Sequence, residues 1–180
     1  MNDLLGKISS QWEIAGIIFT ILFGSAVHFI YAWTGKKKAV GALAAVNESV
    51  WEHLKLIFTP MLFFSAAEYC FVGKLLPNYF AAKFLAILFG MACIIVLFYT
   101  YSGIMGTNYL WVDILTFIIA AVIAHTCFLW AIQNQVFCGI GFEATAGTGI
   151  LLLTLCFIVF TYRPPHIGLF EDPVLHKYGI

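Results

Sequence analysis

Charge is scarce in this sequence. Asp, Glu, Lys and Arg make up only 10% of its 180 residues, while 62% are hydrophobic and the mean hydropathy is +0.96. Because soluble domains carry about a quarter charged residues, this composition excludes an ordinary soluble domain. Basic and acidic residues balance at nine each, which leaves no excess positive charge for a nucleic-acid surface. We therefore expect no nucleic acid among the partners of this protein.

Recognised chemical motifs are missing as well. The five cysteines contain no C-x-x-C pair, which argues against a disulfide framework or a structural zinc knot. No H-E-x-x-H zinc motif and no known nucleophile motif occurs. Residues 1–12 lack the basic leader of a secretory signal, so we expect the first apolar run to be retained. The sequence therefore names neither a substrate nor a reaction.

Long apolar runs fill most of the chain and predict about five transmembrane helices. Each run is close to the roughly 20 residues that a helix needs to cross a membrane. The expected spans are residues 14–33, 54–72, 80–101, 110–132 and 145–162. The sequence thus predicts an all-α polytopic membrane helix bundle that forms one integral domain over residues 1–180, with membrane lipids around it.

Lysine and arginine residues are unevenly spread between the two sides of these predicted spans. With an outside amino terminus, six fall on the inner side: Lys36, Lys37, Lys38, Lys55, Arg163 and Lys177. Three fall on the outer side: Lys7, Lys74 and Lys83. Because cytoplasmic segments are enriched in Lys and Arg, we predict an outside amino terminus and an inside carboxyl terminus. Glu68 lies about 30 Å along the second helix from Glu48, so we expect it at the outer surface.

The densest cluster of ionisable groups is residues 47–55, which read Asn-Glu-Ser-Val-Trp-Glu-His-Leu-Lys. Asn47 is a candidate N-cap of the second helix. If the helix starts later, Ser49 and Glu52 match the Ser-x-x-Glu capping box. A capped and partly solvated helix start is therefore one interpretation of this stretch.

A functional site is the other interpretation. On a continuous helix Glu48, Glu52 and Lys55 share one face, whereas His53 points roughly opposite. Two desolvated carboxylates this close need a cation, so we expect Glu48 or Glu52 to be held by a histidine such as His28 or His53. Carboxylates and imidazoles together bind metals or relay protons. Both interpretations stay open at this point.

Three segments carry a resemblance to a known family. They are residues 47–55, the preceding His28-Phe29-Ile30-Tyr31, and the tail from Pro164-Pro165-His166 to Phe170-Glu171-Asp172-Pro173. Together they resemble a family of small bacterial multi-pass membrane proteins of unknown function, over most of the chain. The resemblance implies a bacterial plasma-membrane protein. Because the family carries no assigned activity, it transfers no catalytic residue.

The predicted topology gathers polar side chains in the cytoplasmic third of the membrane. The residues concerned are His28, Glu48, Glu52, His53, Tyr99, Tyr101, Asp113 and His166. A histidine that faces lipid is costly, so His28 should face the interior of the bundle. His125 lies about 18 Å deeper than Asp113 along the fourth helix and cannot share a ligand with it directly. The tail after the last span either folds back against the bundle or lies among the lipid headgroups.

Three classes of function fit this polar layer. The first is a metal-assisted, membrane-embedded enzyme on a lipid-like substrate, with a divalent metal such as zinc as its cofactor. Its metal ligands would be His28, His53 and His166, and its catalytic carboxylates Glu48, Glu52 and Asp113. The second is a proton-linked carrier or binding module for a small solute, to which five spans without an internal repeat are poorly suited unless a homo-oligomer forms. The third is a structural or assembly protein.

Overall fold

The computed structural model describes residues 2–180, with side chains described from Ser10 onward. Five long helices make up the bundle: α1 (Asn2–Trp33), α3 (Val50–Phe71), α4 (Tyr79–Met105), α5 (Leu110–Gln133) and α6 (Ile140–Tyr162). The short helix α2 (Lys38–Gly41) and the 3-10 turn η1 (Gly73–Leu75) lie in connections. Within residues 2–180, the β structure is a single isolated bridge between Glu171 and Tyr178. The predicted all-α class is confirmed.

All five long helices are long and apolar enough to cross a membrane, in α1 over Ser10–Trp33, which makes the chain a multi-pass membrane protein. Each of them extends beyond its predicted span at one end or both: α1 begins at Asn2, α3 at Val50 and α6 at Ile140, α4 ends at Met105, and α5 is longer by one residue. Hydroxyl side chains at the predicted ends of α4 and α6 donate to the helix itself. Ser102 Oγ donates to the Phe98 carbonyl at 2.6 Å, and Thr145 Oγ1 donates to the Gly141 carbonyl at 2.8 Å. These polar residues therefore do not end the helices.

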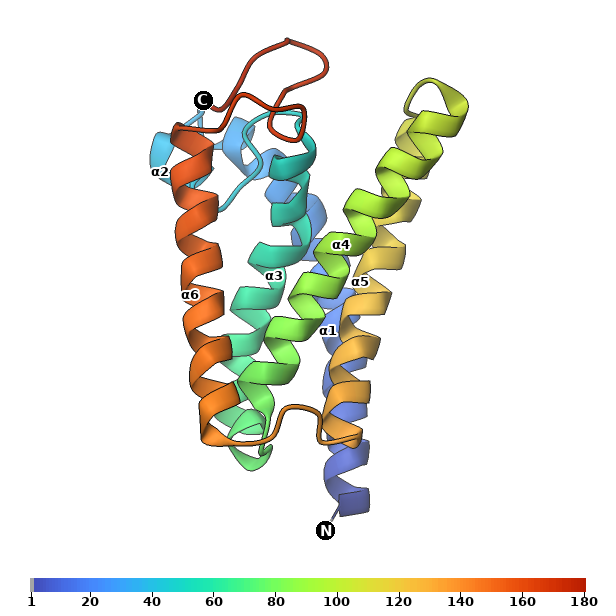
Figure 1. Cartoon of the computed structure of the whole chain (residues 1–180), viewed down its shortest axis with the longest axis vertical. Coiled ribbons are helices and arrows are strands. Elements are labelled where there is room, and N and C mark those ends of the chain that lie inside the picture. Colours follow the sequence, from blue (N-terminus) through green and yellow to red (C-terminus); the bar gives the residue numbers. More distant parts are fainter. Residues whose placement is uncertain (1) are drawn as a thin grey trace.

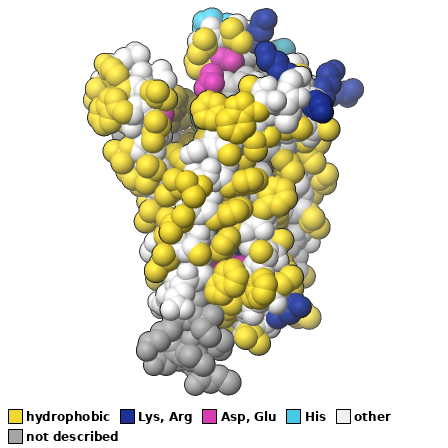
Figure 2. All heavy atoms as spheres, turned by 180° about the vertical axis from the view of Figure 1, so that it is seen from behind, with side chains coloured by type: hydrophobic (Ala, Val, Ile, Leu, Met, Phe, Trp, Pro, Cys, Tyr) yellow, Lys and Arg dark blue, Asp and Glu magenta, His cyan; other side chains and the backbone are white. Residues whose placement is uncertain are grey.

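The helices pack in a few main pairs. α4 and α5 form a hairpin, α1 packs against α3 and α5, and α6 packs mainly against α4 (Figure 1). The amino terminus and the carboxyl terminus lie at opposite ends of the bundle (Figure 1), as an odd number of crossings requires. At the carboxyl-terminal end, the tips of α4 and α5 lean away from α3 and α6 (Figure 1). Figure 2 shows the resulting notch between the two parts of the surface.

Small residues bring the helix backbones close together. A Cβ atom on Gly24 would lie 2.4 Å from the Leu56 carbonyl oxygen, so α1 and α3 touch at this point. A Cβ atom on Gly90 would lie 2.9 Å from the Ala124 Cβ, which places α4 directly against α5. Close backbone approach at glycine and alanine is a common way of packing membrane helices.

Apolar side chains cover most of the flank of the bundle, as Figure 2 shows for one face. The exposed basic residues gather at the carboxyl-terminal end: Lys36, Lys37, Lys38, Arg163 and Lys177. Lys74 is exposed at the other end. Lys55 and Lys83 are buried, so they belong in neither count of surface charge. Without Lys55 and Lys83, basic residues are still more numerous at the carboxyl-terminal end, which favours an inside carboxyl terminus. The orientation stays a prediction.

The tail folds back over the carboxyl-terminal end of the bundle. The Trp51 backbone N–H donates to the Leu169 carbonyl at 3.0 Å, and the Trp51 and Phe170 rings lie 4.8 Å apart. The buried Asp172 carboxylate accepts from the backbone N–H groups of Glu48 at 3.3 Å and Val174 at 2.8 Å. Of the two predicted arrangements of the tail, the structure has the one that packs on the bundle.

Candidate functional site

The start of α3 divides the polar stretch into two parts. Ser49 is the N-cap, and its side chain accepts from the Glu52 backbone N–H at 3.3 Å. Asn47 Oδ1 accepts from the Ser49 backbone N–H at 3.0 Å, so Asn47 shapes the turn before the cap. Glu48 therefore precedes the helix. The predicted shared face of Glu48, Glu52 and Lys55 is wrong, because it assumed a helix that continued back through Glu48.

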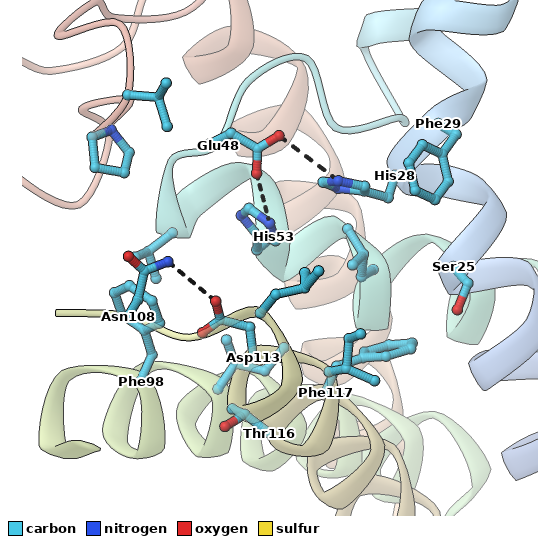
Figure 3. A pocket seen from close by; sticks show the side chains of 17 residues that line it. Ser25, His28, Phe29, Glu48, His53, Phe98, Asn108, Asp113, Thr116 and Phe117 are labelled. Atoms are coloured by element: carbon cyan, nitrogen blue, oxygen red, sulfur yellow. Dashed lines mark hydrogen bonds and ion pairs between the residues drawn. The ribbon is translucent and has the colours of Figure 1, made fainter. Parts of the chain in front are cut away.

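A cavity of about 560 Å³ lies beside this helix start. It opens between α1, α3 and the α4–α5 hairpin, and residues of the tail close one side (Figure 3). Its walls are mainly apolar, for example Leu56, Phe98 and Phe117. Its polar residues are Ser25, His28, Glu48, His53, Asn108, Asp113 and Thr116. The sequence-predicted layer thus contributes four of its members to one cavity.

His28, Glu48 and His53 converge at this cavity (Figure 3). His28 Nε2 lies 3.7 Å from Glu48 Oε1, and His53 Nε2 lies 3.5 Å from Glu48 Oε2. One ligand atom from each of the three residues lies within 4.8 Å of the others. Ligands of a tetrahedral zinc at about 2.1 Å stand about 3.4 Å apart, so small side-chain shifts would enclose an ion. The expected pairing of a glutamate with a histidine is present at Glu48.

Hydrogen bonding orients the imidazole of His53. Its Nδ1 lies 2.9 Å from the Ser49 carbonyl oxygen, which can only accept, so Nδ1 carries a proton. Nε2 then presents either a lone pair or a second proton to the Glu48 carboxylate. If the ring is neutral, the Nε2 lone pair faces a carboxylate oxygen and the two repel each other. A proton or a metal ion between these two atoms would remove the repulsion. The orientation of the His28 ring is not fixed by a hydrogen bond at Nδ1, because this buried atom has no hydrogen-bond partner among the described residues.

Asp113 lies at the start of α5 and faces the same cavity (Figure 3). The Tyr101 hydroxyl donates to Asp113 Oδ1, and Asn108 Nδ2 donates to Asp113 Oδ2 at 3.2 Å. Both donors belong to the α4–α5 hairpin, so this carboxylate has a fixed direction independent of the histidine side. The hydrogen bond to Asp113 accounts for the position of Tyr101, which belongs to the predicted polar layer.

Glu52 lies elsewhere, inside the protein. Its Oε2 accepts from Lys55 Nζ at 2.6 Å and from the Val46 backbone N–H at 3.1 Å. Thr161 Oγ1 lies 2.5 Å from the same ammonium and 3.0 Å from Glu52 Oε1. Glu52 does not line the cavity. Together with Lys55 it joins the segment before α3 to α3 and α6.

His166 also lies apart from the converging residues. Its side chain is on the exposed surface of the tail, where the ring stacks on Tyr178 with centroids 4.5 Å apart. It lines no part of the cavity and is absent from the group of possible metal ligands among the described residues. The structure therefore brings together two of the three predicted histidine ligands and adds Glu48 to them.

A second polar cluster was missed by sequence reasoning. Glu13, Glu68, Lys83 and His125 meet inside the bundle, and each is at most 1% exposed. The prediction that Glu68 lies at the outer surface is therefore wrong, since its length-based argument ignored which way the side chain points. Ionisable residues within spans usually pair with each other, and this rule applied to all four would have indicated a cluster.

Comparisons with known proteins give one family. The model of a family described as Family of unknown function (DUF6512) matches residues 1–180 of the chain. No curated protein and no solved structure matches the chain. The expected kinship with a family of unknown function is confirmed over the whole length, and the bacterial source stays a prediction.

Proposed function

The chain belongs to the DUF6512 family of unknown function, and we propose from its cavity that it is a membrane-embedded, metal-assisted hydrolase of a lipid-like substrate. The observation that carries this proposal is the convergence of His28, Glu48 and His53 within 4.8 Å at an apolar cavity. The proposed ligand set keeps the predicted His28 and His53 and replaces His166 with Glu48, which the sequence predicts as a catalytic carboxylate.

The ligand chemistry favours zinc. Two imidazole nitrogens and one carboxylate oxygen are a common set in catalytic zinc sites, and three protein ligands leave one position for water. The Ser49 carbonyl holds the His53 Nδ1 proton, which leaves Nε2 available as the ligand atom. Zinc lowers the pKa of bound water to about 7, which supplies a hydroxide near neutral pH.

Asp113 supplies the proton transfers in the proposed reaction. A metal held by His28, Glu48 and His53 would activate a water molecule toward the carbonyl carbon of an ester, and Asp113 would accept the proton of that water. Asp113 would then return this proton to the leaving oxygen as its bond to the carbonyl carbon breaks. Tyr101 and Asn108 fix the direction of the carboxylate. Water is consumed, and one acid and one alcohol are released.

The cavity indicates an amphipathic substrate. Its volume of about 560 Å³ lies within the range of small-molecule pockets, and its lining combines apolar side chains with polar groups at the helix ends. The described residues that line it include no lysine or arginine, so an anionic headgroup would depend on the metal for its counter-charge. A neutral ester headgroup with an apolar chain fits this lining best.

Metal analysis of the purified protein tests the proposal. After equilibration with zinc and removal of free metal, we expect about one zinc ion per chain, with little bound by Glu48→Gln or His53→Ala. The matched control is His166→Ala, which removes an exposed histidine outside the cavity and should keep the full zinc content. Parent protein that binds no zinc would refute the proposal, and loss of zinc from His166→Ala would refute the ligand set. Ester hydrolysis by the zinc-loaded protein should also fall strongly in Asp113→Asn.

A further inference from the structure

The buried ion network consists of Glu13, Glu68, Lys83 and His125, and it lies apart from the cavity. Lys83 Nζ is 2.7 Å from Glu13 Oε1 and 2.8 Å from Glu68 Oε2, so one ammonium bridges two carboxylates. His125 Nδ1 contacts the other oxygen of Glu13. The four residues come from α1, α3, α4 and α5 in turn. Four helices therefore share one continuous set of ionic contacts.

The network is buried among aromatic side chains. Lys83 Nζ lies 3.6 Å from the centre of the Phe128 ring, and the Phe64 ring packs edge-on against His125. A Cβ atom on Gly16 would lie 2.5 Å from His125 Cε1, so the imidazole rests directly on the backbone of α1. With almost no solvent contact, electrostatic interactions here are weakly screened.

The fixed charges of the network do not balance. Glu13 and Glu68 contribute two negative charges when ionised, and Lys83 contributes one positive charge. A neutral His125 therefore leaves one net negative charge buried in the bundle. A buried charge without a partner is strongly unfavourable, and a group in this position takes up a proton instead. From this count and the contacts we infer that the buried ion network is a proton-binding site that holds one proton at neutral pH.

Hydrogen bonding around His125 is compatible with both protonation states. His125 Nε2 lies 2.9 Å from Thr20 Oγ1, and a hydroxyl can donate or accept after a rotation. When the ring is neutral, Nδ1–H donates to Glu13 and the Thr20 hydroxyl donates to Nε2. When the ring is cationic, Nε2–H donates to Thr20 instead. The proton can thus enter or leave without orphaning a polar atom.

Glu68 offers the other location for the same proton. The Tyr79 hydroxyl lies 2.9 Å from Glu68 Oε2, beside the contact with Lys83. With Tyr79, the ionisable groups that face the network from the four helices are complete in the described residues: Glu13, Glu68, Tyr79, Lys83 and His125. The site is well separated from the cavity, since His125 lies about 18 Å along α5 from Asp113. It is a second binding site, independent of the proposed hydrolase.

Spectroscopy of the protein in lipid at pH 7 tests the bound proton. We expect either an infrared carbonyl band of a protonated carboxyl group or the nitrogen NMR signature of a cationic His125. Glu68→Gln removes one negative charge, so the network becomes neutral without the proton and either signal should disappear. Glu171→Gln, in the tail, makes the same chemical change outside the network and should leave the signal intact. Absence of both signals from the parent, or their persistence in Glu68→Gln, would overturn the inference.

Stability measurements test the charge count separately. Lys83→Met leaves two carboxylates without an ammonium, so its thermal midpoint should fall well below that of the parent. Adding Glu68→Gln to Lys83→Met removes one of these carboxylates and should raise the midpoint again. If the double variant is as unstable as the sum of its single changes, the charges are not coupled and the inference fails. If Lys83→Met alone does not fold, the expected result is that Lys83→Met with Glu68→Gln folds again, and a double variant that also fails to fold would overturn the inference.

Discussion

Replacement of Glu52 by alanine should destabilise the protein without removing the metal. The change deletes the carboxylate that lies 2.6 Å from Lys55 Nζ and accepts from the Val46 backbone N–H at 3.1 Å. Lys55 is 0% exposed and would lose its carboxylate counter-ion, so it would have to stay charged without that partner or give up its proton inside the protein. Breaking a buried ion pair on one side costs about 3–5 kcal/mol. For a chain of this size the thermal midpoint should fall by about 10 °C.

The assay compares two glutamates that stand four residues apart in the sequence. Thermal unfolding in detergent and zinc content are measured for Glu52→Ala and Glu48→Gln, side by side with the parent. Glu52→Ala should lose stability and keep its zinc, whereas Glu48→Gln should keep its stability and lose its zinc. A stable Glu52→Ala that loses zinc or hydrolytic activity would refute the reasoning, because Glu52 would then act in the site and not as a structural contact.

Three further outcomes follow from the structure. A membrane-impermeant thiol reagent on intact cells should label the exposed Cys138 if the amino terminus is outside, and labelling only after lysis would reverse the orientation. Gly16→Ala should lower the thermal midpoint, because the new Cβ meets His125 Cε1 at 2.5 Å; an unchanged midpoint would show that the ring can move away. The hydrogen bond from His176 lowers the pKa of Glu171, so this contact stabilises the tail above the ordinary glutamate range. The protection factors of the tail amides, which correct for the intrinsic pH dependence of hydrogen exchange, should fall as the pH drops through that lowered pKa, and pH-independent protection factors would contradict it.

The five long helices could be predicted from the sequence because hydropathy over roughly 20 residues depends on composition and not on partners. Helix ends were harder, since Ser102 and Thr145 satisfy their hydroxyls within their own helices. The position of Glu48 outside α3 depends on the cap at Ser49, which the sequence left as one of two options. A shift of two residues at this cap changed which side chains share a face.

The candidate site was predicted in part. His28 and His53 were expected near the same membrane face, and they do meet, because the first loop returns the chain beside α1. His166 lies on a tail whose fold depends on tertiary contacts, so its place could not be read from helix geometry. The pairing rule for ionisable residues within spans indicates that the residues of the buried ion network have partners. Which of them meet depends on α1 and α5 being neighbours, and no local pattern in the sequence reveals that.

The folded tail has a consequence for the biogenesis of the protein. Asp172 accepts from the Glu48 backbone N–H, and Pro173 and Val174 line the cavity. These residues follow all five spanning helices in the chain, so they leave the ribosome after the last span has been made. The cavity therefore cannot be completed before the last spanning helix has been synthesised. A chain terminated before Asp172 would be a membrane protein with every span in place and no finished site.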